Sequence, residues 1–312
     1  MIKGPGVIRI YEVGLRDGLQ IQKKILTTDE KLALVKSLIK AGCKDIQATS
    51  FVHPRLVPQL ADAEELIQNT EKPESVRLWA LVPNERGIER AAKCSNLFGV
   101  SIVLSASDSH NISNIRMKTS ESLAKLPVLF AAARSAGLIV RVELATSFGC
   151  PFEGAVPIER IIDIARVVYD LKADHLALAD TTGMADPMLV AQRVQAVHAA
   201  VPGLKLSGHF HNTRGAGMAN TLAAWQAGVD IFDASFGGLG GCPFAPGATG
   251  NVATEDMVHM FHQMGVETHT DLNELIKTAQ KAQAFFGFEL PGQVMKAGPA
   301  SKLHNLGYEG ND

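Results

Sequence analysis

The sequence lacks the features that mark four classes of protein. Its net charge is −2, and no run of basic residues forms a patch for nucleic acid or an anionic membrane surface. No apolar run approaches the length of about 20 residues that a membrane span requires. The first six residues also lack the charged-then-apolar pattern of a secretion signal. We therefore expect a cytoplasmic protein that has neither nucleic-acid nor membrane partners.

Cysteines and aromatic residues are few as well. The cysteines have no paired spacing, which argues against a disulfide framework or a zinc knuckle; they are Cys43, Cys94, Cys150 and Cys242. Aromatic residues make up 6% of the chain, apolar residues 46% and charged residues 20%, as in compact globular proteins. Glycine-rich turns with the spacing of a phosphate-binding loop or a dinucleotide-binding fold are also missing.

Strand-like and helix-like segments alternate through most of the chain. Eight apolar runs of strand length are predicted at 7–13, 44–48, 76–82, 97–104, 138–144, 175–179, 204–209 and 229–235. Helical spacing predicts helices between them at 28–42, 60–67, 87–94, 121–136, 158–171, 187–201 and 216–227, and Thr28 is expected to cap the first of these. Such alternation favours an α/β fold, a (β/α)8 TIM barrel, over an open sheet. We expect residues 1–290 to form this domain with a C-terminal helix at 272–286, and residues 291–312 to form a tail.

Polar residues end several of the predicted strands, where active sites of such barrels are built. His209 and His211 stand two apart in the seventh strand, so both imidazoles would point the same way. Taken alone, the pair is equally well explained by one packed and one exposed histidine. Asp17, at the end of the first strand, adds a carboxylate from across the barrel mouth. Such a set with open positions suits Mg²⁺, Mn²⁺ or Zn²⁺. Glu143 and Asp180 also end strands, where they would orient the ligands or serve as structural carboxylates.

Several motifs resemble a single enzyme family. They occupy residues 12–20 (EVGLRDGLQ), 48–52 (ATSFV), 149–154 (GCPFEG), 238–245 (GLGGCPFA) and 250–256 (GNVATED). Together they are similar to the 3-hydroxy-3-methylglutaryl-CoA lyase family of metal-dependent barrel lyases. The resemblance covers residues 7–291, nearly the whole chain.

This resemblance implies a reaction and a set of residues for it. The reaction is a divalent-cation-dependent retro-Claisen cleavage of a tertiary 3-hydroxyacyl-CoA to acetyl-CoA and a keto acid such as acetoacetate. The metal ligands would be Asp17, His209, His211 and Asn251. A cation that holds the hydroxyl oxygen lowers the cost of forming the alkoxide. Arg16 would stabilise the enolate of acetyl-CoA, and Cys242 corresponds to the catalytic cysteine that returns a proton.

The chain departs from the family pattern at the barrel mouth. The family usually has glutamate where Gln47 stands, aspartate where Asn212 stands and tyrosine where Arg214 stands. Each exchange adds about one unit of positive charge. We therefore expect a substrate that differs at its acyl end, such as a citramalyl-CoA whose carboxylate pairs with Arg214. The expected substrate-binding residues are Gln20, Gln47, Asn114 and Arg214.

Two other classes stay open at this point. A Claisen-type synthase would share Arg16, Asp17 and the two histidines, because the same enolate is stabilised in both directions, but it would usually carry a long regulatory extension. A non-catalytic metabolite-binding protein is supported only by the three charge changes. Barrel helices often pack against a second subunit, so a homo-oligomer also stays open.

Overall fold

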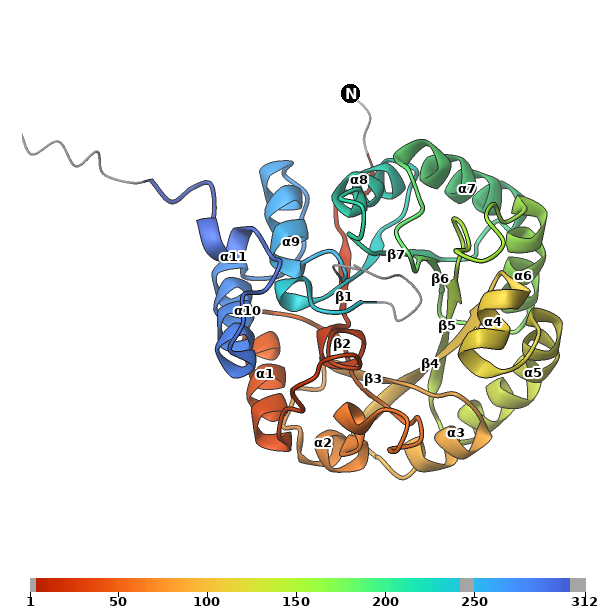
Figure 1. Ribbon diagram of the computed structural model, residues 1–312, viewed down its shortest axis with the longest axis horizontal. Helices are drawn as coiled ribbons and strands as arrows, with labels where there is room; N and C mark the ends of the chain where they lie inside the picture. Colours follow the sequence, from red (N-terminus) through yellow and green to blue (C-terminus); the bar gives the residue numbers. More distant parts are fainter. Residues whose placement is uncertain (1–3, 242–249, 304–312) are drawn as a thin grey trace, which may run out of the picture.

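The computed structural model describes residues 4–241 and 250–303 of the chain. Eight parallel strands close into a barrel in sequence order, which confirms the expected fold (Figure 1). The strands are β1 (Arg9–Glu12), β2 (Asp45–Ser50), β3 (Arg77–Leu81), β4 (Leu97–Ser105), β5 (Ile139–Ala145), β6 (Leu176–Asp180), β7 (Leu206–Phe210) and β8 (Ile231–Ala234). Closure pairs β1 with both β2 and β8, so the barrel has no free sheet edge.

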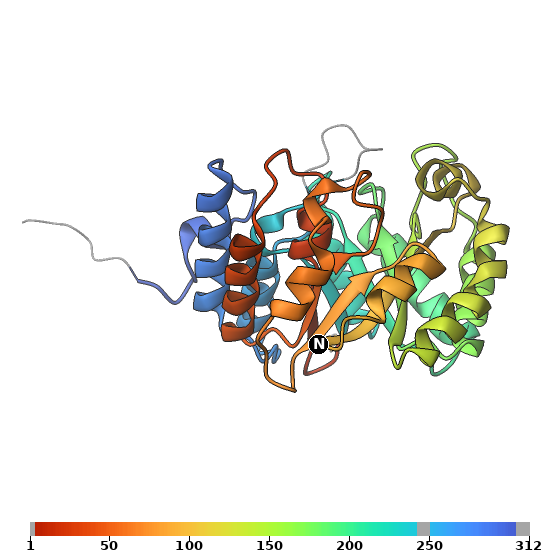
Figure 2. The ribbon, with the colours of Figure 1, turned by 90° about the horizontal axis from the view of Figure 1, so that it is seen from below.

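Helices surround the barrel and cover its outer apolar face. They are α1 (Thr28–Lys40), α2 (Ala63–Asn69), α3 (Glu85–Ala91), α4 (Asp108–Ile115), α5 (Thr119–Ser135), α6 (Ile158–Asp170), α7 (Pro187–Ala200), α8 (Gly217–Gln226), α9 (Thr254–Gln263), α10 (Leu272–Phe286) and α11 (Val294–Ala297). In α6, residues Ile161, Ile164, Ala165 and Val168 are buried, which is the stripe expected of an amphipathic helix. The predicted C-terminal helix is present as α10, which lies beside α1 and α9 (Figure 2). In the described part of the chain no helix is long and apolar enough to cross a membrane.

The inside of the barrel is polar, although most barrel interiors are filled by branched apolar side chains. Arg141 on β5 pairs with Asp233 on β8 through contacts of 3.2 and 2.6 Å, and its guanidinium lies 3.8 Å from the ring centre of Tyr11 on β1. At the amino end of the strands, Asp45 accepts hydrogen bonds from Arg9, Arg77 and the indole of Trp79. Since a buried charge must be paired, these bonds hold the interior together.

Three local expectations were wrong or incomplete. The first helix is capped by Thr27, not Thr28, because Thr27 and Glu30 exchange side-chain bonds with each other's backbone N–H groups. Arg16 and Asp17 do not end a strand; they lie on a turn of π-helix, Gly14–Gly18, that follows β1. Helices α4, α9 and α11 were not predicted; the polar sequence of α4 has no clear apolar stripe, and the side chain of Ser107 caps it.

Two buried glutamates, Glu12 on β1 and Glu255 on α9, make the free energy of unfolding depend on pH. Burial, and then the charge of Asp256, raises the pKa of Glu255 to about 8, and burial raises the pKa of Glu12 to about 7. Both carboxyls bind a proton more tightly in the folded than in the unfolded chain. Their stabilising contribution is therefore complete below the pKa of an unfolded glutamate, about 4.3, and is lost as pH rises through 7 to 8.

We expect Glu255→Gln to raise the melting temperature relative to the unsubstituted chain as the pH increases. The amide cannot ionise, so the difference should grow by about 5 °C or more between pH 5.5 and pH 9. Thermal unfolding followed by circular dichroism at several pH values measures it, with the exposed Glu85→Gln as control. A difference that is constant with pH would contradict the expectation.

Candidate active site

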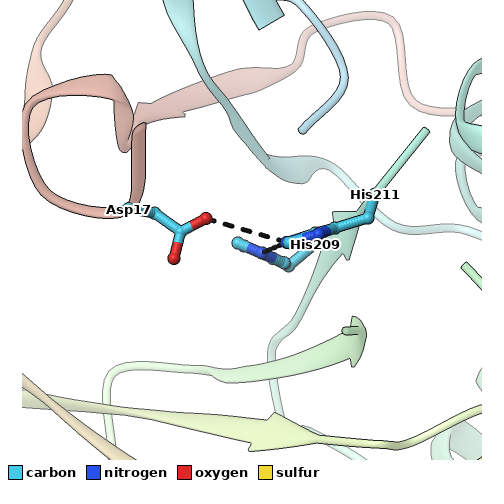
Figure 3. Close-up of side chains that lie close together, drawn as sticks. All are labelled: Asp17, His209 and His211. Carbon is cyan, nitrogen blue, oxygen red and sulfur yellow. Dashed lines mark hydrogen bonds and ion pairs between the residues drawn. The ribbon is translucent and has the colours of Figure 1, made fainter. Parts of the chain in front are cut away.

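Three buried side chains converge at the carboxyl end of the barrel. Asp17 comes from the turn after β1, and His209 and His211 come from the end of β7 (Figure 3). One possible ligand atom from each lies within 4.8 Å of the others. The two Nε2 atoms are 3.1 Å apart, and His211 Nε2 lies 3.7 Å from Asp17 Oδ2. The structure thus brings together the two histidines and the carboxylate; their role as ligands stays a prediction.

Asn251, three residues before α9 begins, contacts this group. Its backbone forms a bridge with that of His211, and its Nδ2 donates to Asp17 Oδ2 at 2.7 Å and to Leu239 O at 3.0 Å. Gly240 next to it has a φ of +126°, and a Cβ there would lie 2.5 Å from Asn251 Nδ2. Asn251 Oδ1 is buried and has no hydrogen-bond partner among the described residues.

The donor set fits a divalent cation. An unpartnered amide oxygen, a carboxylate and two imidazole nitrogens that face each other are all electron-pair donors. Oxygen and imidazole ligands suit Mg²⁺, Mn²⁺ and Zn²⁺ alike. The described residues therefore contain a possible divalent-metal site, and its geometry does not distinguish among these ions.

Asp233 orients His209 toward this group. His209 Nδ1 lies 3.0 Å from Asp233 Oδ2, so this nitrogen donates and Nε2 keeps its lone pair for the site. Burial opposes the charged imidazole of His209, but the hydrogen bond and charge of Asp233, with Asp17, raise its pKa overall. Burial and the neighbouring His209 lower the pKa of His211 to about 4, so that its imidazole is neutral at pH 7.

Arg16 lies beside the group and is almost fully buried, so its pairing with Asp17 is not an ordinary surface ion pair. Its Nη1 donates to Asp17 Oδ1 at 2.7 Å, its Nη2 donates to Glu143 Oε2 at 3.0 Å, and its Nε donates to Gln47 Oε1. Gln20 Nε2 donates to Asp17 Oδ1 at 3.1 Å. Burial favours a neutral Asp17, but Arg16 and the two histidines outweigh it and lower the pKa of Asp17. Four residues predicted from the sequence, Arg16, Asp17, Gln20 and Gln47, are thus in direct contact.

Three predicted residues are not joined to this group in the described part of the chain. Asn114 is exposed on α4. Arg214 is exposed, and its Nη1 donates to the carbonyl oxygens of Thr182 and Gly183 at 2.7 and 3.0 Å. Cys242 lies outside the described residues.

Sequence reasoning missed two charged residues inside the barrel and left the role of a third, at its mouth, undecided. Asp233 and Arg141 were not singled out, although a charged residue inside an apolar strand is itself a sign of a buried partner. Asp180 lies at the end of β6, where its Oδ1 accepts from Met184 N at 2.7 Å and its buried Oδ2 has no partner within residues 4–241 and 250–303. Burial raises the pKa of Asp180 to about 6.

Comparisons with known proteins agree on one family. The HMGL-like family model matches residues 7–281. Hydroxymethylglutaryl-CoA lyase of Bacillus subtilis is 40% identical over 292 residues, which are 94% of this chain and 97% of the relative. (R)-Citramalyl-CoA lyase of Chloroflexus aurantiacus is 42% identical over 302 residues, 94% of this chain and 95% of that protein. The solved structure of an HMG-CoA lyase from Acinetobacter baumannii, in complex with coenzyme A and 3-methylmalate, matches with a TM-score of 0.91 and 39% identity over 96% of this chain and 98% of that chain.

Proposed function

The chain belongs to the HMGL-like family, and we propose that it cleaves a tertiary 3-hydroxyacyl-CoA, either 3-hydroxy-3-methylglutaryl-CoA or a close analogue, by a divalent-cation-dependent retro-Claisen reaction. The chain is a carbon–carbon lyase. The products are acetyl-CoA and a keto acid. The observation that carries the proposal is the buried group of Asp17, His209 and His211 with Arg16 at its side.

The residues divide the chemistry between them. Asp17, His209, His211 and Asn251 would hold the cation, Mg²⁺ or Mn²⁺ in our proposal, which supplies positive charge near the substrate hydroxyl when it is bound. The hydroxyl passes its proton to solvent, its oxygen becomes the carbonyl oxygen of the keto acid, and the bond to the acetyl carbon breaks. The electron pair moves onto the thioester as an enolate, whose oxygen the Arg16 guanidinium stabilises. A proton then returns to the acetyl carbon.

Cys242 is the proposed donor of that proton. A thiol of ordinary pKa is protonated at pH 7 and can serve as the acid. We expect Cys242→Ala to lower kcat by about tenfold or more and to leave Mn²⁺ affinity unchanged. Steady-state kinetics and Mn²⁺ titration measure the two effects, with the buried Cys94→Ala as control. Unchanged turnover would rule out Cys242 as the acid.

Two acyl groups are candidates for the substrate. The relatives include both a hydroxymethylglutaryl-CoA lyase and an (R)-citramalyl-CoA lyase at similar identity. Citramalyl-CoA is the lesser alternative, and its basis is the departure from the family pattern at Arg214, whose guanidinium donates to the carbonyls of Thr182 and Gly183 and is exposed to solvent. A substrate carboxylate could pair with it there.

A panel of acyl-CoA thioesters tests the proposal. Both thioesters would be assayed with Mg²⁺ and with Mn²⁺, before and after addition of a chelator. We expect cleavage that the chelator abolishes and that added cation restores. Best turnover of 3-hydroxy-3-methylglutaryl-CoA would reject the altered acyl group, whereas metal binding without any cleavage would favour a metabolite-binding protein. A cytoplasmic location and the absence of nucleic-acid partners stay predictions.

A further inference from the structure

We propose that Glu143 and Gln47 together form a clamp that positions Arg16, in which Glu143 supplies the one carboxylate charge that the family pattern has at position 47. The inference rests on the proposed function, because it assigns Glu143 a role through Arg16. Glu143 is a positioning residue in this view: it touches Arg16 and Gln47.

The two residues meet inside the barrel from strands that are not neighbours. Gln47 lies on β2 and Glu143 on β5, and both are buried. Gln47 Nε2 donates to Glu143 Oε1 at 2.8 Å, and Glu143 Oε2 accepts from Arg16 Nη2 at 3.0 Å. Since Arg16 Nε donates to Gln47 Oε1, the three side chains form a closed ring of hydrogen bonds.

The Gln47 amide forms hydrogen bonds through both its oxygen and its nitrogen. Its oxygen accepts from Arg16, and its nitrogen donates to Glu143 and, at 2.7 Å, to Ser101 Oγ on β4. A flipped amide would put an NH₂ group against a guanidinium and an oxygen against a carboxylate. The amide therefore has one favourable orientation, and it bridges the positive Arg16 and the negative Glu143.

The charges show why residues 47 and 143 depend on each other. A glutamate at position 47 would bring two carboxylate oxygens to the 2.8 Å separation that now joins Gln47 to Glu143. Like charges this close are not both tolerated without a proton between them. Loss of the Glu143 charge, in contrast, would leave Arg16 with one fewer anionic acceptor. One carboxylate in this pair is thus needed, and a second is excluded.

The contacts of Glu143 show that it acts on Arg16 and not on the proposed metal ligands. The sequence alone left Glu143 either as a group that orients ligands or as a structural carboxylate. In the structure its hydrogen bonds are with Arg16 and Gln47, and Arg141 Nη2 lies 3.5 Å from its Oε1. Asp233 is the residue that bonds to His209.

A charge exchange tests the clamp. We expect Glu143→Gln and Gln47→Glu each to lower kcat by about 30-fold, and the double variant that carries both to recover to within about fivefold of the unsubstituted enzyme. KM and Mn²⁺ affinity should change by less than about threefold in all three, because the metal ligands are untouched. Ser101→Ala, which removes a neutral partner of the same amide, is the matched control and should lower kcat by less than about threefold.

The thermal midpoints of the same variants give a second readout that does not need activity. Gln47→Glu should lower the midpoint and the added Glu143→Gln should restore it. Additive effects of the two changes on kcat and on the midpoint, or an unchanged kcat in Glu143→Gln, would overturn the clamp. If the unsubstituted chain cleaves no thioester, the proposed function fails, and the midpoint cycle alone then supports or rejects the interaction.

Discussion

Replacement of His211 by alanine is expected to weaken Mn²⁺ binding by about 100-fold or more and to lower kcat by about 1000-fold. The reason is that the polar neighbours of this imidazole are His209 Nε2 and Asp17 Oδ2, both members of the proposed metal group, while its Nδ1 has no partner in the described part of the chain. Its loss should remove a ligand without breaking a hydrogen bond that holds the fold.

Metal affinity and folding must be measured separately for this result to be clear. Mn²⁺ binding can be followed by electron paramagnetic resonance, kcat by acetyl-CoA release, and folding by the thermal midpoint in the presence of a chelator. His262→Ala is the control, because that imidazole is exposed on α9 and bonds to Thr268. Mn²⁺ affinity equal to that of the control would show that His211 is not a ligand.

Arg16→Lys is expected to lower kcat by about 300-fold while KM and Mn²⁺ affinity change by less than about threefold. Lysine keeps the charge, but its three N–H donors sit on one nitrogen and cannot reproduce the planar fork of a guanidinium. The Arg16 fork reaches acceptors on three elements at once, which are Asp17, Gln47 and Glu143. The loss should therefore appear in the step that develops negative charge on the thioester.

The matched control for this prediction is Arg90, a second arginine that is paired with a carboxylate but lies outside the site. Arg90 binds the carboxylate of Glu64 through two contacts of 2.6 and 2.8 Å between the outer helices α2 and α3. Arg90→Lys should change kcat by less than about twofold. If Arg16→Lys kept kcat within about fivefold, the assignment of Arg16 to the enolate would be wrong.

The barrel and much of its mouth could be predicted from the sequence because both follow from short-range periodicity. The period of two placed His209 and His211 on one face, and the repeat of strands and helices placed Asp17 at the same mouth. The expected position of Asp17 on the opposite side was wrong, because only β8 separates β1 from β7 in the closed barrel. The roles expected for Arg16 and Asn251 came from the family resemblance and not from periodicity. Contacts across the barrel interior have no such period. Gln47 and Glu143 are 96 positions apart, and nothing in either strand specifies that they meet.

The missed pair inside the barrel has a related cause. Arg141 and Asp233 are separated by 92 positions, and each lies in a strand that otherwise reads as apolar. Strand patterns show which face a residue is on, but the partner that neutralises it comes from the closure of the sheet. Helix α4 was missed for the opposite reason, since its sequence is polar and a cap at Ser107 defines its start.

The hydrogen bond from Asn251 to Leu239 identifies two positions between which the chain can be exchanged in protein engineering. This bond of 3.0 Å holds Leu239 and Asn251 together at the mouth of the barrel, so a chimera that takes residues 240–250 from a relative should keep both junctions in place. Gly250 sets one condition, since its φ is +96° and a Cβ there would lie 2.4 Å from Gly238 O. Gly240, where a Cβ would lie 2.5 Å from Asn251 Nδ2, and Cys242, the proposed acid, must be kept as well, and chimeras can then vary the remaining positions while Asp17, His209 and His211 stay unchanged.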